Sequence, residues 1–224
     1  MITKAVIFDL DGTLLDTIED IAESMNQALS QFNKPSFSIE EYKIFVGRGV
    51  DNLVREVLGS EANDETLFMH VKKQYLANYL ILQNNHTKPY AGINTLLEDL
   101  RQAHIHVCVL SNKPNVDTNK VIEHFFPGYP FFAVVGHKPE YPVKPDPTSA
   151  KWIISTLNVE NEAILYVGDT GTDMETAVNA NLTPVGVLWG FRQKEELLKG
   201  GALYIITHPS ELIKIIERRN AHDS

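Results

Sequence analysis

Short apolar runs alternate with segments of helical periodicity along most of the chain. The first run covers residues 4–10 and is apolar at nearly every position, which is typical of a strand buried on both faces. Comparable runs recur at 105–110, 131–135, 163–167, 184–188 and 202–206. The segments between most of these runs carry apolar residues at the three- and four-residue spacing of a helix. Strands that alternate with helices predict an α/β fold with a parallel sheet and helices on both of its faces.

Four apolar stripes predict helices that cover this sheet. The stripes are Leu96, Leu97, Leu100 and Ala103; Ala150, Ile153, Ile154 and Leu157; Met174, Ala177 and Val178; and Leu212, Ile213 and Ile216. A helix with one apolar face buries that face against a neighbouring layer, so each stripe is expected to face the sheet. We also expect the two tryptophans, Trp152 and Trp189, to pack helices against the sheet.

The segment 16–82 interrupts the alternation because it reads as consecutive helices without an apolar strand between them. Asp16 with Glu19, and Ser38 with Glu41, have the spacing of N-terminal capping pairs. A helical segment of this length can bury its own apolar stripes and form a small domain above the sheet.

The sequence therefore predicts two parts. Residues 1–15 and 83–224 are expected to form a discontinuous α/β core, a doubly wound parallel sheet of Rossmann-like type. Residues 16–82 are expected to form an all-helical cap inserted after the first strand.

Composition and charge exclude several classes of protein. Hydrophobic residues make up 43% and charged residues 22%, which is a globular rather than a disordered or fibrous composition. The net charge of -9 argues against a nucleic-acid binder that works through a general basic field. The single cysteine, Cys108, excludes an internal disulfide and allows a reducing compartment. No apolar stretch approaches the ~20 residues that span a bilayer. We expect a cytoplasmic protein that binds neither membranes nor nucleic acids.

The strongest chemical signal follows the first apolar run. Asp9, Asp11, Gly12 and Thr13 come directly after it, and ligand sites in parallel α/β sheets form beyond the carboxyl ends of strands. Residues two apart on a strand point the same way, so Asp9 and Asp11 can face one small volume. Taken alone, the pair also fits two solvated acids in a turn with Gly12.

Three further polar clusters follow other predicted strands or precede the helices after them. Ser111 and Asn112 can donate hydrogen bonds to phosphate oxygens, and Lys144 can reach the same edge of the sheet. Asp169 and Asp173 add two carboxylates, the ligand type that Mg²⁺ prefers. Each cluster alone also fits an ordinary turn, a surface lysine or a helix cap. Their convergence on one edge of one sheet favours metal-assisted phosphoryl transfer.

The sequence resembles the haloacid dehalogenase superfamily of phosphotransferases over its whole length. Residues 8–14 are nearly a literal copy of the first motif of that superfamily. The positions of its other three motifs are occupied by Ser111, Lys144 and the pair Asp169 and Asp173. The helical insertion resembles the C1-type cap of the superfamily.

Three shorter segments, 46–50, 89–92 and 111–114, resemble the phosphoglycolate phosphatase branch. The resemblance implies a Mg²⁺-dependent phosphatase that hydrolyses a small phosphorylated metabolite, with phosphoglycolate as the leading candidate. A pyrophosphatase or phosphomutase of the same superfamily is an alternative. A non-catalytic regulator that binds a ligand in the cleft is an alternative from another class. Both a monomer and a homodimer fit the sequence.

The resemblance also implies catalytic roles. Asp9 would attack phosphorus and form an aspartyl-phosphate. Asp11 would protonate the leaving alkoxide and then activate the water that hydrolyses the intermediate. Ser111 and Lys144 would hold the transferring phosphoryl oxygens.

The implied metal ligands are Asp9, the backbone carbonyl of Asp11 and Asp169, with Asp173 binding directly or through water. The remaining candidates are substrate contacts. They are Thr13 and Asn112 in the core and Gly47, Arg48 and Gly49 in the cap. The two glycines permit a close backbone approach, and the resemblance implies that this loop faces the catalytic aspartates. Arg48 offers a guanidinium suited to a substrate carboxylate, although a solvated arginine beside helix-ending glycines fits the sequence as well.

Overall fold

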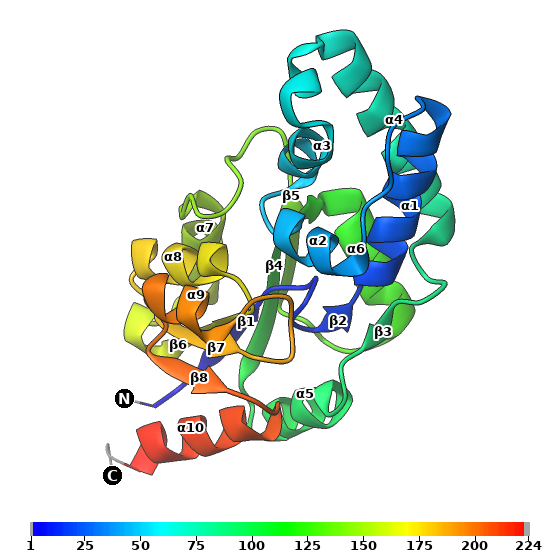
Figure 1. Cartoon of the computed structure of the whole chain (residues 1–224). Helices are drawn as coiled ribbons and strands as arrows, with labels where there is room; N and C mark the ends of the chain where they lie inside the picture. Colours follow the sequence, from blue (N-terminus) through cyan, green and yellow to red (C-terminus); the bar gives the residue numbers. More distant parts are fainter. Residues whose placement is uncertain (1, 222–224) are drawn as a thin grey trace.

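A six-stranded parallel sheet forms the centre of the molecule, seen in a computed structural model that describes residues 2–221 (Figure 1). The strand order is β5-β4-β1-β6-β7-β8, and each neighbouring pair runs parallel. The strands are β1 (Ala5–Phe8), β4 (His106–Pro114), β5 (Ala133–His137), β6 (Ile164–Gly168), β7 (Thr183–Val187) and β8 (Tyr204–Ile206). This order confirms the predicted α/β fold with a doubly wound parallel sheet.

Helices cover both faces of the sheet because alternate strand residues point to opposite sides. Val6 and Phe8 pack with the helices α5, α6 and α10, whereas Ala5 and Ile7 pack with α7 and α8. The core helices are α5 (Ile93–Gln102), α6 (Asn115–Phe125), α7 (Thr148–Leu157), α8 (Gly171–Asn179), α9 (Lys194–Lys199) and α10 (Ser210–Ala221). A short 3-10 turn, η2 (Asn161–Ala163), leads into β6.

The four α-helices between residues 18 and 82 gather at one end of the molecule, beyond the carboxyl ends of the strands (Figure 1). They are α1 (Ile18–Gln31), α2 (Ile39–Phe45), α3 (Val50–Leu58) and α4 (Glu65–Leu82), with the 3-10 turn η1 (Gly59–Asn63). These helices bury a hydrophobic cluster of their own that includes Met25, Tyr42, Val54 and Val71. One core residue, Phe191, joins this cluster.

The chain passes between the sheet and this helical part through a small antiparallel pair. Its strands are β2 (Leu15–Asp16) and β3 (Lys88–Pro89). We call residues 16–82 the cap and the rest the core. The boundaries between them stay a prediction, and the ends of the core at 1 and 224 lie outside the described residues.

Several local expectations are confirmed and others are wrong. Ser38 and Glu41 form the expected capping box of α2. Asp16 does not cap α1, because it lies in β2 and Thr17 is the residue that precedes the helix. Trp152 is 48% exposed and Val178 49% exposed, since both lie on the solvent sides of their helices.

Two further expectations from the sequence concern Ala103, at the end of α5, and Trp189. Ala103 is exposed because α5 ends at Gln102 and the chain turns there. Trp189 is partly buried against the core cluster, as expected, and its indole N–H donates to the carbonyl of Thr13 at 3.0 Å.

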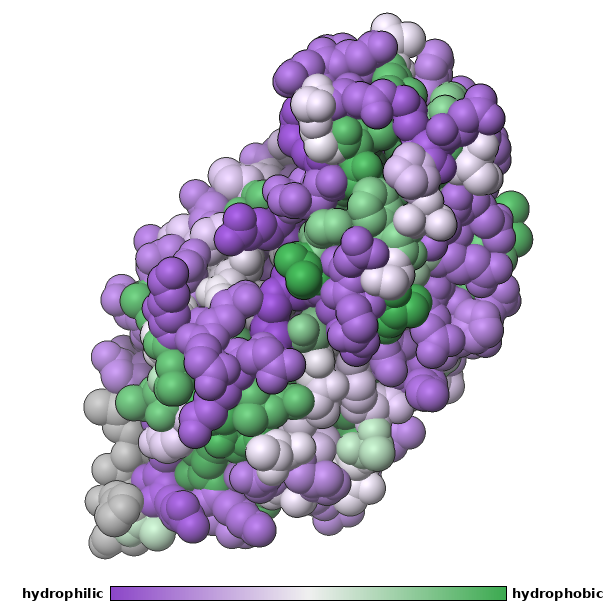
Figure 2. Space-filling model, in the orientation of Figure 1, coloured by the Kyte–Doolittle hydropathy of each residue, from purple (hydrophilic) through white to green (hydrophobic). Residues whose placement is uncertain are grey.

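The surface is mainly hydrophilic on the face in Figure 2, where apolar side chains emerge in scattered groups. Among residues 2–221, no helix combines the length and the apolar character needed to cross a bilayer.

Candidate active site

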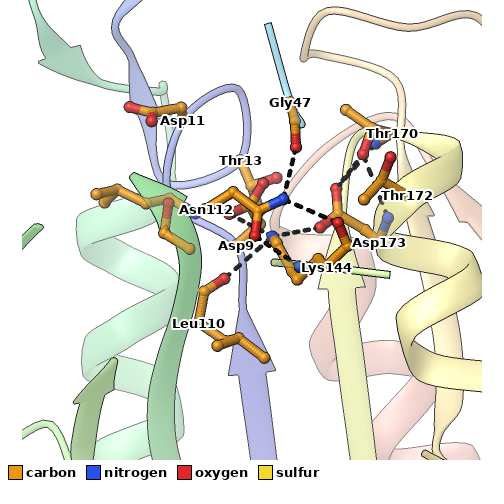
Figure 3. A network of polar contacts seen from close by, with 12 residues as sticks. Asp9, Asp11, Thr13, Gly47, Leu110, Asn112, Lys144, Thr170, Thr172 and Asp173 are labelled. Atoms are coloured by element: carbon orange, nitrogen blue, oxygen red, sulfur yellow. Dashed lines mark hydrogen bonds and ion pairs between the residues drawn. The ribbon is translucent and has the colours of Figure 1, made fainter. Parts of the chain in front are cut away.

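A buried cluster of charged side chains lies at the carboxyl ends of the central strands (Figure 3). Asp9 follows β1, and Asp169 follows β6. Asp173 lies in the first turn of α8, Lys144 lies in the loop before α7, and Ser111 lies near the end of β4. The parallel sheet therefore brings together residues that are more than a hundred positions apart in sequence.

Asp9 is held through one of its two carboxylate oxygens. The oxygen Oδ1 accepts the backbone N–H of Leu10 at 2.7 Å and lies 2.8 Å from the ammonium nitrogen of Lys144. Within the described part of the chain, no donor contacts the other oxygen, Oδ2. Asp9 also lines a pocket between the cap and the core. One oxygen is thus fixed, and the other is available to a ligand.

Lys144 links the buried carboxylates to the sheet. Its ammonium nitrogen donates to Asp173 Oδ1 at 2.7 Å and to the carbonyl of Leu110 at 3.2 Å, in addition to its contact with Asp9. These three contacts occupy the three donors of an ammonium group. In this arrangement Lys144 orients Asp9 and offsets part of the negative charge.

Asp169 is surrounded by donors and by close backbone. Its Oδ1 accepts the hydroxyl of Thr13 at 3.0 Å, and its Oδ2 accepts the backbone N–H of Phe191 at 2.8 Å. A Cβ on Gly12 would lie 2.3 Å from Asp169 Oδ2, and a Cβ on Gly190 would lie 2.3 Å from Asp169 Cβ. Both positions therefore require glycine for the chain to close around this carboxylate.

Asp173 has partners on both oxygens as well. Its Oδ2 accepts the hydroxyl of Thr170 at 2.7 Å and the backbone N–H of Thr170 at 3.1 Å, which forms a capping box at the start of α8. Its Oδ1 accepts from Lys144. Helix capping, the ordinary alternative for this residue, therefore occurs together with the contact to the charged cluster.

Burial and mutual repulsion shift the pKa values of this cluster. Burial, followed by the charge of Asp173, raises the pKa of Asp9 well above its usual range, although Lys144 acts in the opposite direction. The same two causes raise the pKa of Asp169 to about 7. Burial alone would lower the pKa of Lys144, but the carboxylates of Asp173 and Asp9 raise it well above its usual range. The cluster thus holds more negative charge than its single ammonium neutralises.

The donor set fits a hard divalent cation. Asp9, Asp169 and Asp173 each offer an oxygen, and these ligand atoms lie within 4.8 Å of one another. Carboxylate oxygens are the ligands that Mg²⁺ prefers, and a dication would offset the excess negative charge. These residues could therefore hold Mg²⁺.

The carboxylate of Asp11 lies apart from the cluster and points away from it (Figure 3). Both of its oxygens accept hydrogen bonds from the ammonium group of Lys113, at 2.8 and 3.0 Å. Asp11 lines the same pocket as Asp9. The side chains of Asp9 and Asp11 therefore face the same pocket but bind different partners.

Lys113 is a site residue that the sequence analysis missed as a candidate. The signal was present, because Lys113 follows Ser111 by two positions on β4 and residues two apart share a face of a strand. A lysine in a strand-end turn is most often solvated, so only the contact with Asp11 identifies it. Its side chain is 5% exposed.

Two predicted substrate contacts in the core have other partners. The hydroxyl of Thr13 donates to Asp169 and is buried. The amide of Asn112 donates to the carbonyls of Gly47 and Lys144 at 3.0 and 3.2 Å and accepts the N–H of Lys144 at 2.8 Å. Thr13 thus orients a carboxylate, and Asn112 joins the cap loop to the Lys144 loop.

The cap loop divides between two cavities. Gly47 and Gly49 line the pocket with Asp9 and Asp11, and that cavity has a volume of about 50 Å³. Arg48 instead lines a separate cavity of about 390 Å³ with Arg192 and Glu196. The loop therefore meets the catalytic aspartates through its two glycines, whereas Arg48 lines the other cavity, and a contact of Arg48 with the substrate stays a prediction.

The site combines a buried carboxylate with one available oxygen, a serine hydroxyl, a lysine and a candidate metal cluster beneath a cap. Such a site can form a covalent bond from Asp9 to an electrophile whose negative charge is neutralised by cations. Phosphoryl groups have this requirement.

Comparison with known proteins agrees with this chemistry. The sequence profile of the haloacid dehalogenase-like hydrolases matches residues 6–187. The chain is 28% identical over 218 residues to a phosphoglycolate phosphatase of Vibrio parahaemolyticus, covering 95% of this chain and 96% of that protein. It is 29% identical over 215 residues to the phosphoglycolate phosphatase of Aquifex aeolicus, covering 96% and 97%.

A solved structure is also similar to this chain. A protein of Lactobacillus delbrueckii subsp. bulgaricus assigned as a phosphoglycolate phosphatase is 32% identical, with a TM-score of 0.89. The match covers 96% of this chain and 99% of that protein. The likeness thus includes the cap as well as the core.

Proposed function

The chain belongs to the haloacid dehalogenase-like hydrolase family and is a phosphatase, and from this premise we propose that it hydrolyses a small phosphomonoester through an aspartyl-phosphate on Asp9. Phosphoglycolate is the leading candidate substrate, since it is the substrate in the names of the relatives. The observation that supports the nucleophile most is the asymmetry of Asp9. Its Oδ1 is held by Leu10 and Lys144, and its Oδ2 is available in the pocket.

The first step transfers the phosphoryl group to the protein. A carboxylate oxygen of Asp9 forms a bond to phosphorus while the bond between phosphorus and the leaving oxygen breaks. Asp11 supplies the proton that the leaving alkoxide takes up. Its place in the pocket, with a carboxylate separate from that of Asp9, fits this role, because the leaving group must lie opposite the attacking oxygen.

The second step releases phosphate. Asp11, now ionised, takes a proton from a water molecule as that water forms a bond to phosphorus. The bond between phosphorus and Asp9 breaks, and the carboxylate is restored. Closure of the cap limits the access of other water to the intermediate.

Ser111 and Lys144 serve the phosphoryl group in different ways. The hydroxyl oxygen of Ser111 accepts the N–H of Lys113 at 3.2 Å, so its own hydrogen is free to donate to a phosphoryl oxygen. Lys144 keeps Asp9 oriented, and it reaches a phosphoryl oxygen only by exchanging one of its three contacts.

Mg²⁺ is the proposed cofactor. Asp9, Asp169 and the backbone carbonyl of Asp11 would hold it, with Asp173 directly or through water. When bound, the ion offsets the charge of the carboxylates and of the transferring phosphoryl group.

Replacement of the nucleophile tests this function. Asp9→Asn keeps the shape but removes the anionic oxygen, so phosphate release from phosphoglycolate should fall by at least about a hundredfold. The matched control is Asp99→Asn, an exposed carboxylate on α5, which should leave the rate unchanged. Rates are measured with Mg²⁺ present, beside a thermal unfolding curve of each variant. An Asp9→Asn protein that folds and keeps more than about a hundredth of the rate contradicts a covalent role for Asp9.

A further inference from the structure

The pocket beside Asp9 has two unlike walls. The cap side carries the glycines Gly47 and Gly49, two tyrosines, Tyr75 and Tyr79, and otherwise aliphatic side chains. The core side carries Asp9, Asp11, Asp117 and a single cationic residue, Lys113. Within the described part of the chain, any anionic group that enters this pocket beyond the phosphoryl group has Lys113 as its one cationic partner among the lining residues.

The contacts of Lys113 leave one hydrogen-bond donor of its ammonium group unused. Its ammonium group donates to both oxygens of Asp11 and lies 4.5 Å from the centre of the Tyr79 ring. An ammonium has three donors, and two are used by Asp11. The third donor remains for a ligand. The apolar wall opposite strengthens a charged contact here, because it keeps water away.

Tyr79 provides a second feature that points to a ligand. The residue is 2% exposed, and its hydroxyl is buried without a hydrogen-bond partner among the described residues. A buried polar group without a partner is costly, so a ligand oxygen near it would be stabilised. Burial also raises the pKa of Tyr79 well above its usual range, so the hydroxyl keeps its proton and can donate it in a hydrogen bond.

We propose that Lys113 and Tyr79 determine specificity by binding an anionic substituent, such as a carboxylate, on the leaving group of the substrate. This inference rests on the proposed function and assigns the selection of acidic substrates to these two residues in place of Arg48. Ser111, which is proposed to contact the phosphoryl group, lies two positions from Lys113 on β4. The carboxylate bound by Lys113 therefore belongs to a short substrate.

The size and charge of the pocket further limit which anionic leaving groups can bind. A cavity of about 50 Å³ holds only a few water-sized groups at ~10–15 Å³ each. Asp11 and Asp117 repel an anion that lies away from Lys113. The pocket thus selects a short leaving group whose charge reaches Lys113, and it rejects bulky or distant anions.

The test compares two substrates of similar size that differ in charge. Phosphoglycolate carries a carboxylate, whereas 2-hydroxyethyl phosphate carries a hydroxyl in its place. Both leave as alkoxides and both need Asp11, so the ratio of their kcat/KM values cancels any disturbance of Asp11. Lys113→Met should lower the ratio of phosphoglycolate to 2-hydroxyethyl phosphate by about tenfold or more. Tyr79→Phe should lower it by about threefold to tenfold.

Three further variants complete the experiment. Lys113→Arg keeps the positive charge and should retain most of the preference. Lys120→Met removes an exposed lysine from α6 and should leave the ratio unchanged. Arg48→Met tests the competing carboxylate-binding residue and should change the ratio less than Lys113→Met does. Tyr79→Phe removes a single hydroxyl without a partner, so it tests the subsite even if Lys113→Met does not fold.

The outcomes separate this inference from the proposed function. An equal loss for both substrates in Lys113→Met and in Tyr79→Phe overturns the subsite, because it means that these residues support only Asp11 or the fold. A larger fall of the ratio in Arg48→Met than in Lys113→Met also overturns it. Hydrolysis of both substrates at equal rates by the unchanged protein excludes selection by charge and leaves the phosphatase intact. Hydrolysis of 2-hydroxyethyl phosphate without any hydrolysis of phosphoglycolate removes the proposed substrate as well.

Discussion

The two walls of the pocket differ in how their residues are held. On the core wall, Asp9 is buried and is joined to Lys144 at 2.8 Å, and Lys144 in turn contacts Asp173 behind the wall at 2.7 Å. The cap wall offers mostly apolar side chains, the backbone of Gly47 and a tyrosine hydroxyl without a partner. The core wall is thus organised before a ligand arrives, as a site for one fixed group such as phosphoryl requires. The cap wall leaves room for the part of the substrate that differs between phosphomonoesters.

One loop of the core connects the two regions. The backbone N–H of Phe191 donates to Asp169, and its side chain is buried in the hydrophobic cluster of the cap. The guanidinium of Arg192 donates to the carbonyls of Ile44 and Val46 at 2.7 and 2.8 Å. Asn112 adds a contact to Gly47. The position of the cap is therefore linked to the loop that contacts a candidate metal ligand.

Removal of the metal should reduce the rate of phosphate release more than any other change, because the charge of the carboxylates and of the phosphoryl group is then no longer offset. EDTA should abolish phosphate release, and Mg²⁺ should restore it. Ca²⁺ accepts 6–8 oxygen ligands and tolerates bidentate carboxylates, so it can engage both oxygens of Asp9 and should inhibit. The measurement is the rate of phosphate release with each ion. Equal rates with Ca²⁺ and Mg²⁺ would argue against a carboxylate that serves as both ligand and nucleophile.

Lys144→Met should strongly reduce both activity and stability. It leaves the carboxylates of Asp9 and Asp173 without their ammonium partner in a buried site, which costs about 3–5 kcal/mol. Urea unfolding without metal measures this loss, and added Mg²⁺ should recover part of it. Lys151→Met, an exposed lysine on α7, is the control. A loss below about 1 kcal/mol, the size of an exposed ion pair, would mean that Lys144 does not compensate the carboxylates.

The raised pKa of Asp169 predicts a pH dependence of the metal-free protein. Its pKa is about 7 when folded and near 3.8 when unfolded, so between these values the folded state binds more protons. The free energy of unfolding should therefore fall as the pH rises from about 4 to 7. Mg²⁺ should reverse the trend, since it binds the ionised carboxylate. Urea titrations at several pH values, with Mg²⁺ and with EDTA, measure both curves. A metal-free stability that rises over this range contradicts the shift.

Arg192→Met should change the activity least, because it weakens the attachment of the cap and leaves the core wall unchanged. The loss of its two contacts to cap carbonyls should raise KM by roughly threefold to tenfold, with a smaller change in kcat. Arg101→Met, which removes an exposed arginine paired with Glu98, is the control. Steady-state kinetics with phosphoglycolate provide the measurement. An unchanged KM would show that the contacts of Phe191 and Asn112 hold the cap without Arg192.

Features that depend on neighbours along the chain could be predicted from the amino-acid sequence alone. Asp9 and Asp169 each follow a run of apolar residues, so their places at strand ends could be predicted from periodicity. The capping box of Ser38 and Glu41 spans three positions and forms within one helical turn. The alternation of strands and helices was sufficient to predict the parallel sheet, because parallel strands joined by helices pack in few ways.

The pairing of side chains from distant segments depends on how the whole chain folds. Lys113 and Asp11 are far apart in sequence, and nothing local indicates their contact. The direction of Arg48 depends on how the cap closes over α8 and α9, which places it in a cavity away from Asp9. The exposure of Trp152 depends on which side of α7 meets the sheet. Periodicity predicts the faces of single elements, whereas these outcomes depend on the relative placement of several elements, which the packing of the whole chain sets.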